Sequence, residues 1–216
     1  MIWELVKKEV IFLTSSLKST IVSIIVISFF LPTVGMGFGM AMPALACYIG
    51  FYGILAYEEK SKMHLLNLAL PVTRKEICLS KYIYAIGFIV FVTLLSSIGS
   101  GLGIVIRGGG ELEGFIASLP IYMTLMFTVA IIYLAIVVPC IFYWGTIKAR
   151  YVLLGIYIAI FIVANNMNSV MKETMSEVLT NTLSGRGIIL IITIAVISMV
   201  ISIGISLKIW EKKDVK

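Results

Sequence analysis

Long runs without Asp, Glu, Lys or Arg constrain this fold more than any other feature of the sequence. Five such runs occupy residues 19–57, 82–106, 114–147, 151–171 and 187–207. A helix needs about 20 apolar residues to cross a bilayer. The chain is 60% hydrophobic and 13% charged, with a mean hydropathy of +1.09. This composition predicts an all-α polytopic membrane protein, because only helices satisfy their own backbone polar groups in lipid without closing into a barrel.

Two of the runs are longer than one span requires. The run 19–57 fits a hairpin of two helices with its break within residues 32–39, where Pro32 ends a helix and glycines permit a turn. The run 114–147 fits one long helix. In that helix we expect Pro120 at the start, Pro139 at a kink and the aromatic residues 142–144 at the end.

The distribution of basic residues favours six spans. Six spans place 14 of the 17 Lys and Arg residues on one side and leave Arg107, Lys172 and Arg186 on the other. Five spans give a weaker split, 11 to 6. The positive-inside rule therefore predicts six spans with both termini in the cytosol. The net charge of +6 is then a topology signal, and no basic patch large enough for nucleic acid is present.

These patterns predict a single transmembrane domain over residues 1–216. Its expected parts are an interfacial helix (1–16), a span hairpin (17–57), a cytosolic coupling segment (58–81), spans three to five (82–106, 115–144 and 151–168), an external amphipathic helix (169–184), span six (187–207) and a basic tail (208–216).

The interfacial helix has one charged residue on its apolar face. Apolar and charged residues alternate at helical spacing over 1–16, which is typical of a helix lying in the membrane interface. Glu9 falls among the apolar residues. We favour a carboxylate that snorkels to water; a pair with a basic group of a partner is the alternative.

Motifs for catalysis or metal binding are missing from the sequence. It contains no HExxH, GxSxG or P-loop, and its only histidine, His64, has no neighbour at ligand spacing. Cys47, Cys78 and Cys140 form no CxxC pattern, so we expect reduced, buried thiols. No span carries Asp, Glu, Lys or Arg near its centre, which disfavours ion-coupled transport and favours an energy source outside this chain.

The coupling segment combines a short amphipathic helix with a helix start signal. We expect a helix over 61–68, with its leucines against the membrane or in a partner's groove, and a break at Pro71. Thr73 and Glu76 then fit a capping box that starts the helix of span three. An ordinary cytosolic loop is the alternative interpretation.

The stretch E-E-K-S-x6-L-x-L-P-V-T-R-K-E-I-x-x-S-K-Y within residues 58–82 resembles the LPvsRkeiv.sKy segment of ABC-2 type transporter permeases. The layout of the whole chain is also similar to theirs. The resemblance implies a type V exporter-like fold, in which the coupling segment docks on a separate ATPase. The residues it assigns to ATPase coupling are Glu58, Glu59, His64, Leu65, Leu66, Leu68, Pro71, Thr73, Arg74 and Glu76.

The same resemblance implies the partners and the location. We expect two copies of an ATPase subunit, which carry ATP and Mg, while this chain binds no cofactor or metal. A second permease subunit, with a homodimer favoured, would share the bacterial cytoplasmic membrane. By analogy with the external gate helices of that fold, the residues Met171, Met175, Val178 and Leu179 would form one face of a gate helix; a surface helix without a gating role is the alternative.

Two small-residue motifs predict close helix packing. Gly35 with Gly39, and Gly99 with Gly103, both match GxxxG. Packing within one subunit is favoured, and a dimer seam is the alternative.

The predicted function is the permease subunit of an ATP-driven exporter. Spans without charges and rich in Met and aromatic residues favour an amphipathic or hydrophobic substrate. A peptide toxin or antimicrobial peptide is the preferred substrate, as in exporters of phenol-soluble modulins. Two alternatives remain: an immunity or binding protein that acts without an ATPase, and an ion-coupled secondary carrier.

Overall fold

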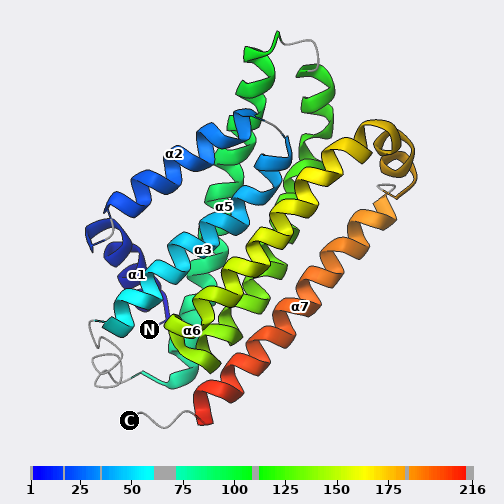
Figure 1. The fold of residues 1–216 in the computed structure, drawn as a ribbon. Helices are drawn as coiled ribbons and strands as arrows, with labels where there is room; N and C mark the ends of the chain where they lie inside the picture. Colours follow the sequence, from blue (N-terminus) through cyan, green and yellow to red (C-terminus); the bar gives the residue numbers. More distant parts are fainter. Residues whose placement is uncertain are drawn as a thin grey trace.

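The fold was determined from a computed structural model (Figure 1). It describes residues 2–16, 18–34, 36–60, 72–108, 112–182 and 185–212. Within these ranges the side chains of residues 13, 16, 36, 37, 74, 147, 160, 163–182, 185–187, 211 and 212 are not described. All regular structure in the described ranges is helical, which confirms the all-α class.

The helices follow the apolar runs of the sequence. The interfacial helix is α1 (Ile2–Ser16), and the first long run forms α2 (Lys18–Val34) and α3 (Met36–Lys60). After the coupling segment come α5 (Arg74–Ile106), α6 (Leu112–Thr182) and α7 (Gly185–Lys212). In α6, two helices are joined at Gly145, whose φ of 77° and ψ of 171° are not helical. A break directly after Trp144 agrees with the predicted end of span four.

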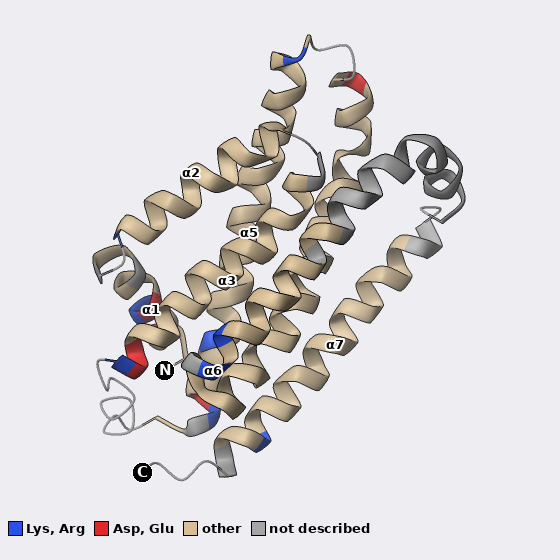
Figure 2. Cartoon of the chain, in the orientation of Figure 1, with Lys and Arg blue, Asp and Glu red and all other residues tan. Residues whose placement is uncertain are grey.

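The long helices run side by side, and the bundle that they form has two distinct ends (Figure 1). α1 and the last turns of α7 lie at one end, while the C-terminal end of α5 and the start of α6 form a hairpin that projects at the other. Figure 2 shows that the charged residues of the described part gather at the first end, and that the helix lengths between the ends are almost free of them. We call these the charged end and the hairpin end. The hairpin end carries Arg107 and Glu113.

Four described helices are long and apolar enough to cross a membrane. They are Phe38–Lys60, Lys75–Ile106, Leu112–Thr146 and Ile188–Trp210. A shorter apolar helix covers Lys18–Val34. The predicted fifth span lies in the second half of α6, where side chains are described only as far as residue 162. The chain is thus a multi-pass membrane protein, while the count of six spans and the cytosolic side of the termini stay predictions.

Pro32 and Pro120, which we expect at helix ends, lie inside helices. Pro32 lies within α2, and α6 starts at Leu112, eight residues before Pro120. Membrane helices tolerate interior proline because neighbouring groups and local adjustments satisfy the freed carbonyl. The break between α2 and α3 still falls inside the predicted stretch 32–39.

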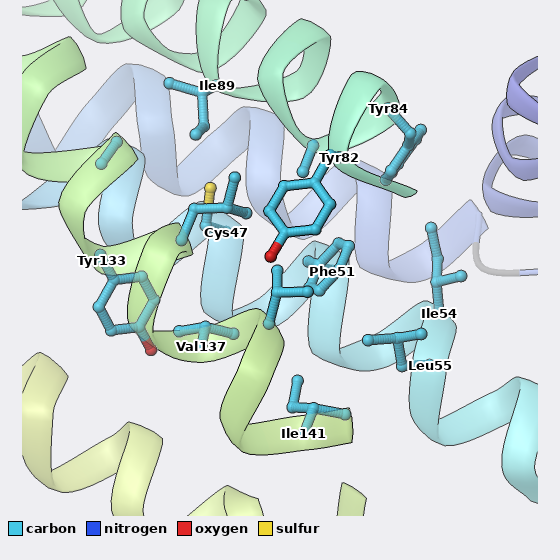
Figure 3. Close-up of a cluster of buried hydrophobic side chains, with 14 of the residues drawn as sticks. Cys47, Phe51, Ile54, Leu55, Tyr82, Tyr84, Ile89, Tyr133, Val137 and Ile141 are labelled. Atoms are coloured by element: carbon cyan, nitrogen blue, oxygen red, sulfur yellow. The ribbon is translucent and has the colours of Figure 1, made fainter. Parts of the chain in front are cut away.

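The packed interior lies where α3, α5 and α6 meet. Figure 3 shows Cys47, Phe51 and Leu55 of α3 facing Tyr82 of α5 and Tyr133 of α6. Cys47 and Cys78 are buried and Cys140 is partly buried; all three are free thiols. α1 adds Val6 and Phe12 to the same cluster, so the interfacial helix is packed against the bundle.

Glycines allow α2 and α5 to cross closely. A Cβ at Gly103 would lie 2.6 Å from the backbone of Thr33, and a Cβ at Gly99 would meet the carbonyl oxygen of Phe29. Arg107 donates to the Thr33 carbonyl beside this crossing. The Gly99 and Gly103 pair therefore packs within one chain. Gly39 faces Tyr122 and Ser100, and Gly35 lies outside the described residues.

Candidate coupling site

The last turn of α3 is held by a buried cluster of charges. Glu58 is 6% exposed, and its Oε2 accepts from Lys81 Nζ at 2.5 Å. Lys81, on α5, is 3% exposed and also donates to Glu9 Oε1 at 3.4 Å. Lys8 Nζ lies 3.7 Å from Glu58 Oε1. We call Lys8, Glu9, Glu58 and Lys81 the four-charge cluster; it joins α1, α3 and α5.

The cluster balances two carboxylates against two ammonium groups. A buried charge without a partner is costly, whereas one with partners and hydrogen bonds is tolerated. Glu58 and Lys81 stand on either side of residues 61–71, so their ion pair closes the base of the coupling segment. The pair thus joins the end of α3 to the start of α5.

Glu9 does not snorkel, and its described pair lies within the same chain. It is 4% exposed and contacts Lys81, so the snorkelling interpretation is wrong, and the basic group described beside it belongs to this chain. Burial raises the pKa of Glu9 above its ordinary value, and the charges of Lys81 and Lys8 oppose that shift. The apolar face of α1 carries a carboxylate because the bundle supplies a buried lysine 72 residues away.

Glu59 makes a second contact from the same turn of α3. Its Oε2 accepts from the backbone N–H of Thr146 at 3.1 Å and from the Thr146 hydroxyl. Thr146 is the first residue after the break at Gly145, so its N–H has no carbonyl partner within the new helix. A carboxylate at this point also meets the partial positive charge of a helix N-terminus. The neighbouring residues Glu58 and Glu59 therefore tie α3 to α1, to α5 and to the helix after Gly145.

The capping box expected from the sequence is present at the start of α5. The Thr73 hydroxyl accepts from the Glu76 backbone N–H at 3.3 Å, and the Glu76 carboxylate accepts from the Thr73 N–H at 2.9 Å. The box fixes where α5 begins, about two turns before Lys81. Thr73 is exposed and available to a soluble partner.

The same end of α5 is also fixed to α7. Tyr82 follows Lys81, and its hydroxyl lies 2.7 Å from Ser202 Oγ and 2.8 Å from Ser206 Oγ. Four residues after Ser206, Trp210 of α7 packs on Phe142 of α6, with ring centroids 4.9 Å apart. Neither the contact of Tyr82 with α7 nor that of Phe142 with Trp210 was predicted from the sequence, and the same holds for the contacts of Lys81 and Thr146.

Several predicted site residues lie outside the described residues. His64, Leu65, Leu66, Leu68 and Pro71 belong to this group, and the Arg74 side chain is not described. The same holds for the side chains of the predicted gate residues Met171, Met175, Val178 and Leu179. Of the predicted coupling residues, the structure places Glu58 and Glu59 in the last turn of α3, and Thr73 and Glu76 at the start of α5.

The described residues contain no group of three or more His, Cys, Asp or Glu side chains placed to hold a metal ion. The site offers ion pairs, a helix cap and a hydrogen-bonded helix start. Such contacts suit the transmission of movement between helices.

Comparison with known proteins identifies the family. The family model described as "ABC-2 family transporter protein" matches residues 4–211. No curated protein and no solved structure matches the chain. The match covers nearly the whole sequence, so the chain belongs to the ABC-2 family, whose members are typically non-catalytic membrane subunits that work with an ATPase partner.

Proposed function

We propose that this chain is the permease subunit of an ATP-driven exporter, and that its ATPase docks on the coupling segment, 58–81. The observation that carries the proposal is the ion pair between Glu58 and Lys81 across the base of that segment. A partner that moves residues 61–71 would pull on α3, α5 and α1 as one unit. Binding of ATP would drive the change through the different affinities of the ATPase for the two states.

The proposed docking surface consists of the residues assigned by the family resemblance. Leu65, Leu66 and Leu68 supply apolar contacts, and the capped start of α5 supplies a rigid support. ATP and Mg belong to the partner, which we expect in two copies. With the family's layout, the charged end faces the cytosol of a bacterial cell and both termini lie inside.

A second permease subunit completes the proposed transporter, with a homodimer favoured. α7 exposes large aliphatic side chains along most of its length, and α2 and α5 expose others. These faces suit lipid and a second membrane-embedded subunit. The predicted external helix over 169–184 would gate the path at the hairpin end.

The proposed substrate is amphipathic or hydrophobic, and a peptide toxin or antimicrobial peptide is preferred. Four of the buried residues of α5 toward the hairpin end are hydroxyl-bearing: Thr93, Ser96, Ser97 and Ser100. A lining of this kind suits backbone amides and apolar side chains better than a small ion.

Co-purification tests the proposal. A tagged chain extracted in mild detergent from its native membrane is expected to bring down an ABC ATPase. Leu66→Asp is expected to reduce the recovered ATPase at least tenfold, because a charge would enter an apolar contact. Asn67→Asp is the matched control, since it adds the same charge on the polar side of the same predicted helix. Equal recovery with Leu66→Asp and wild type, or no ATPase at all, would contradict the proposal.

A further inference from the structure

The second half of α6 has no short covalent route to the coupling segment. Glu59 lies two residues before residue 61, whereas Thr146 lies 87 residues further along the chain. The hydrogen bonds between these two residues link the last turn of α3 to the helix that follows Gly145.

The helix after Gly145 is held to the bundle by a narrow stripe. Thr146, Ala149 and Leu153 are buried, and their spacing of three and four residues puts them on one face. The Tyr133 hydroxyl donates to the Leu153 carbonyl at 3.3 Å. Nearly all the other described side chains between 148 and 154 are exposed. Glu59 contributes the polar contact at the first turn of this stripe.

Gly145 makes that polar contact possible. Its φ of 77° lies in the region that favours glycine, and this turn frees the Thr146 N–H from the preceding helix. A carboxylate from α3 accepts this N–H and the adjacent hydroxyl with one oxygen. A side chain at the end of one helix therefore caps the start of another that is distant in sequence.

We propose that Glu59 is a positioning residue that fastens the helix after Gly145 to the end of α3, so that the two move together when the ATPase binds ATP. This inference rests on the proposed function and extends it. Glu58 passes the movement to α5 through Lys81, and Glu59 passes it to the second half of α6 through Thr146. The predicted fifth span thereby follows the coupling segment.

Distance measurement between two nitroxide labels tests the role. Lys60 and Lys148 are exposed on either side of the contact and are replaced by labelled cysteine, with Cys47, Cys78 and Cys140 changed to alanine. The labelled chain is mixed with an excess of unlabelled chain and isolated with the ATPase that co-purifies. Distances are recorded without nucleotide and after trapping with ATP and vanadate.

Wild type is expected to give one narrow distance distribution that is the same in both states. Glu59→Ala is expected to add a second, longer distance only after trapping. Without the hydrogen bonds from Thr146 to the Glu59 carboxylate, the helix after Gly145 no longer follows the end of α3 when the ATPase binds ATP. Thr146→Val, which keeps the backbone N–H, is expected to give a smaller second population. Thr146→Ser, which keeps both donors, and the matched control Glu113→Ala at the hairpin end are expected to behave as wild type.

Three results would overturn the positioning role while the proposed function stands: a Glu59→Ala distribution that stays narrow, one that broadens equally without nucleotide, or a wild-type distance that shifts on trapping. Broadening without nucleotide would show a purely structural contact. If no ATPase co-purifies, the proposed function fails first and the positioning role falls with it.

Discussion

Glu58 near the end of α3 and Lys81 near the start of α5 meet at 2.5 Å. Both side chains are buried, and Glu9 of α1 shares the lysine. The interfacial helix, the end of one membrane helix and the start of the next thus meet around one ammonium group.

Removing that ammonium group is expected to destabilise the bundle strongly. Lys81→Met leaves the buried carboxylates of Glu9 and Glu58 without the ammonium group that they share, and should lower the free energy of unfolding by about 3–5 kcal/mol. Lys7→Met is the matched control, because its pair with Glu4 is exposed and is worth about 0–1 kcal/mol. Thermal unfolding of the purified chain in detergent compares the two. Similar melting temperatures for both variants would contradict the buried network.

Glu9 is expected to make stability depend on pH. Burial raises its pKa in the folded chain above the ordinary 4.5, so the folded state holds the proton more tightly. The stabilisation from Glu9 is therefore fully present below pH 4.5 and is lost as pH rises through the folded pKa. Wild type should lose stability relative to Glu9→Gln over the pH range above about 4.5. Denaturation across this range measures the difference, with Glu4→Gln on the exposed face of α1 as the control. If wild type instead became more stable relative to Glu9→Gln as pH rises, the pKa of Glu9 would not be raised in the folded chain.

A single added methyl group at the crossing of α2 and α5 is expected to destabilise the fold. Gly103→Ala would place its Cβ 2.6 Å from Thr33 backbone atoms, and such overpacking costs about 1–3 kcal/mol. Gly87→Ala in the same helix meets nothing within 4 Å and should be neutral or slightly stabilising. Melting temperatures in detergent test the pair. If Gly103→Ala were as stable as Gly87→Ala, the helices would not cross as closely as described.

Local signals in the sequence predicted local structure well. The capping box of Thr73 and Glu76 spans four residues and forms as expected, since every group it needs lies within one turn. The all-α class followed from the long apolar runs. The expectation that Pro32 and Pro120 mark helix ends was wrong, because rules drawn from helices in water overstate the effect of proline within a membrane protein.

The contacts of the coupling site could not be predicted in the same way. Lys81 pairs with a residue 72 positions away and Glu59 with one 87 positions away, so no local pattern connects them. One signal was present in the sequence: a carboxylate on the apolar face of a helix, at Glu9, needs a basic partner or contact with water. Only the packing of α1 against α5 showed that Lys81 supplies it.

Photocrosslinking from position 66 tests the central claim most directly. A photoreactive amino acid replaces Leu66 in the full-length chain in native membranes, and the same residue at Ile116, exposed near the hairpin end, is the control. Docking on the coupling segment predicts a covalent adduct with an ABC ATPase from position 66 and none from position 116. An adduct with lipid alone from position 66, or an ATPase adduct from position 116 instead, would contradict it.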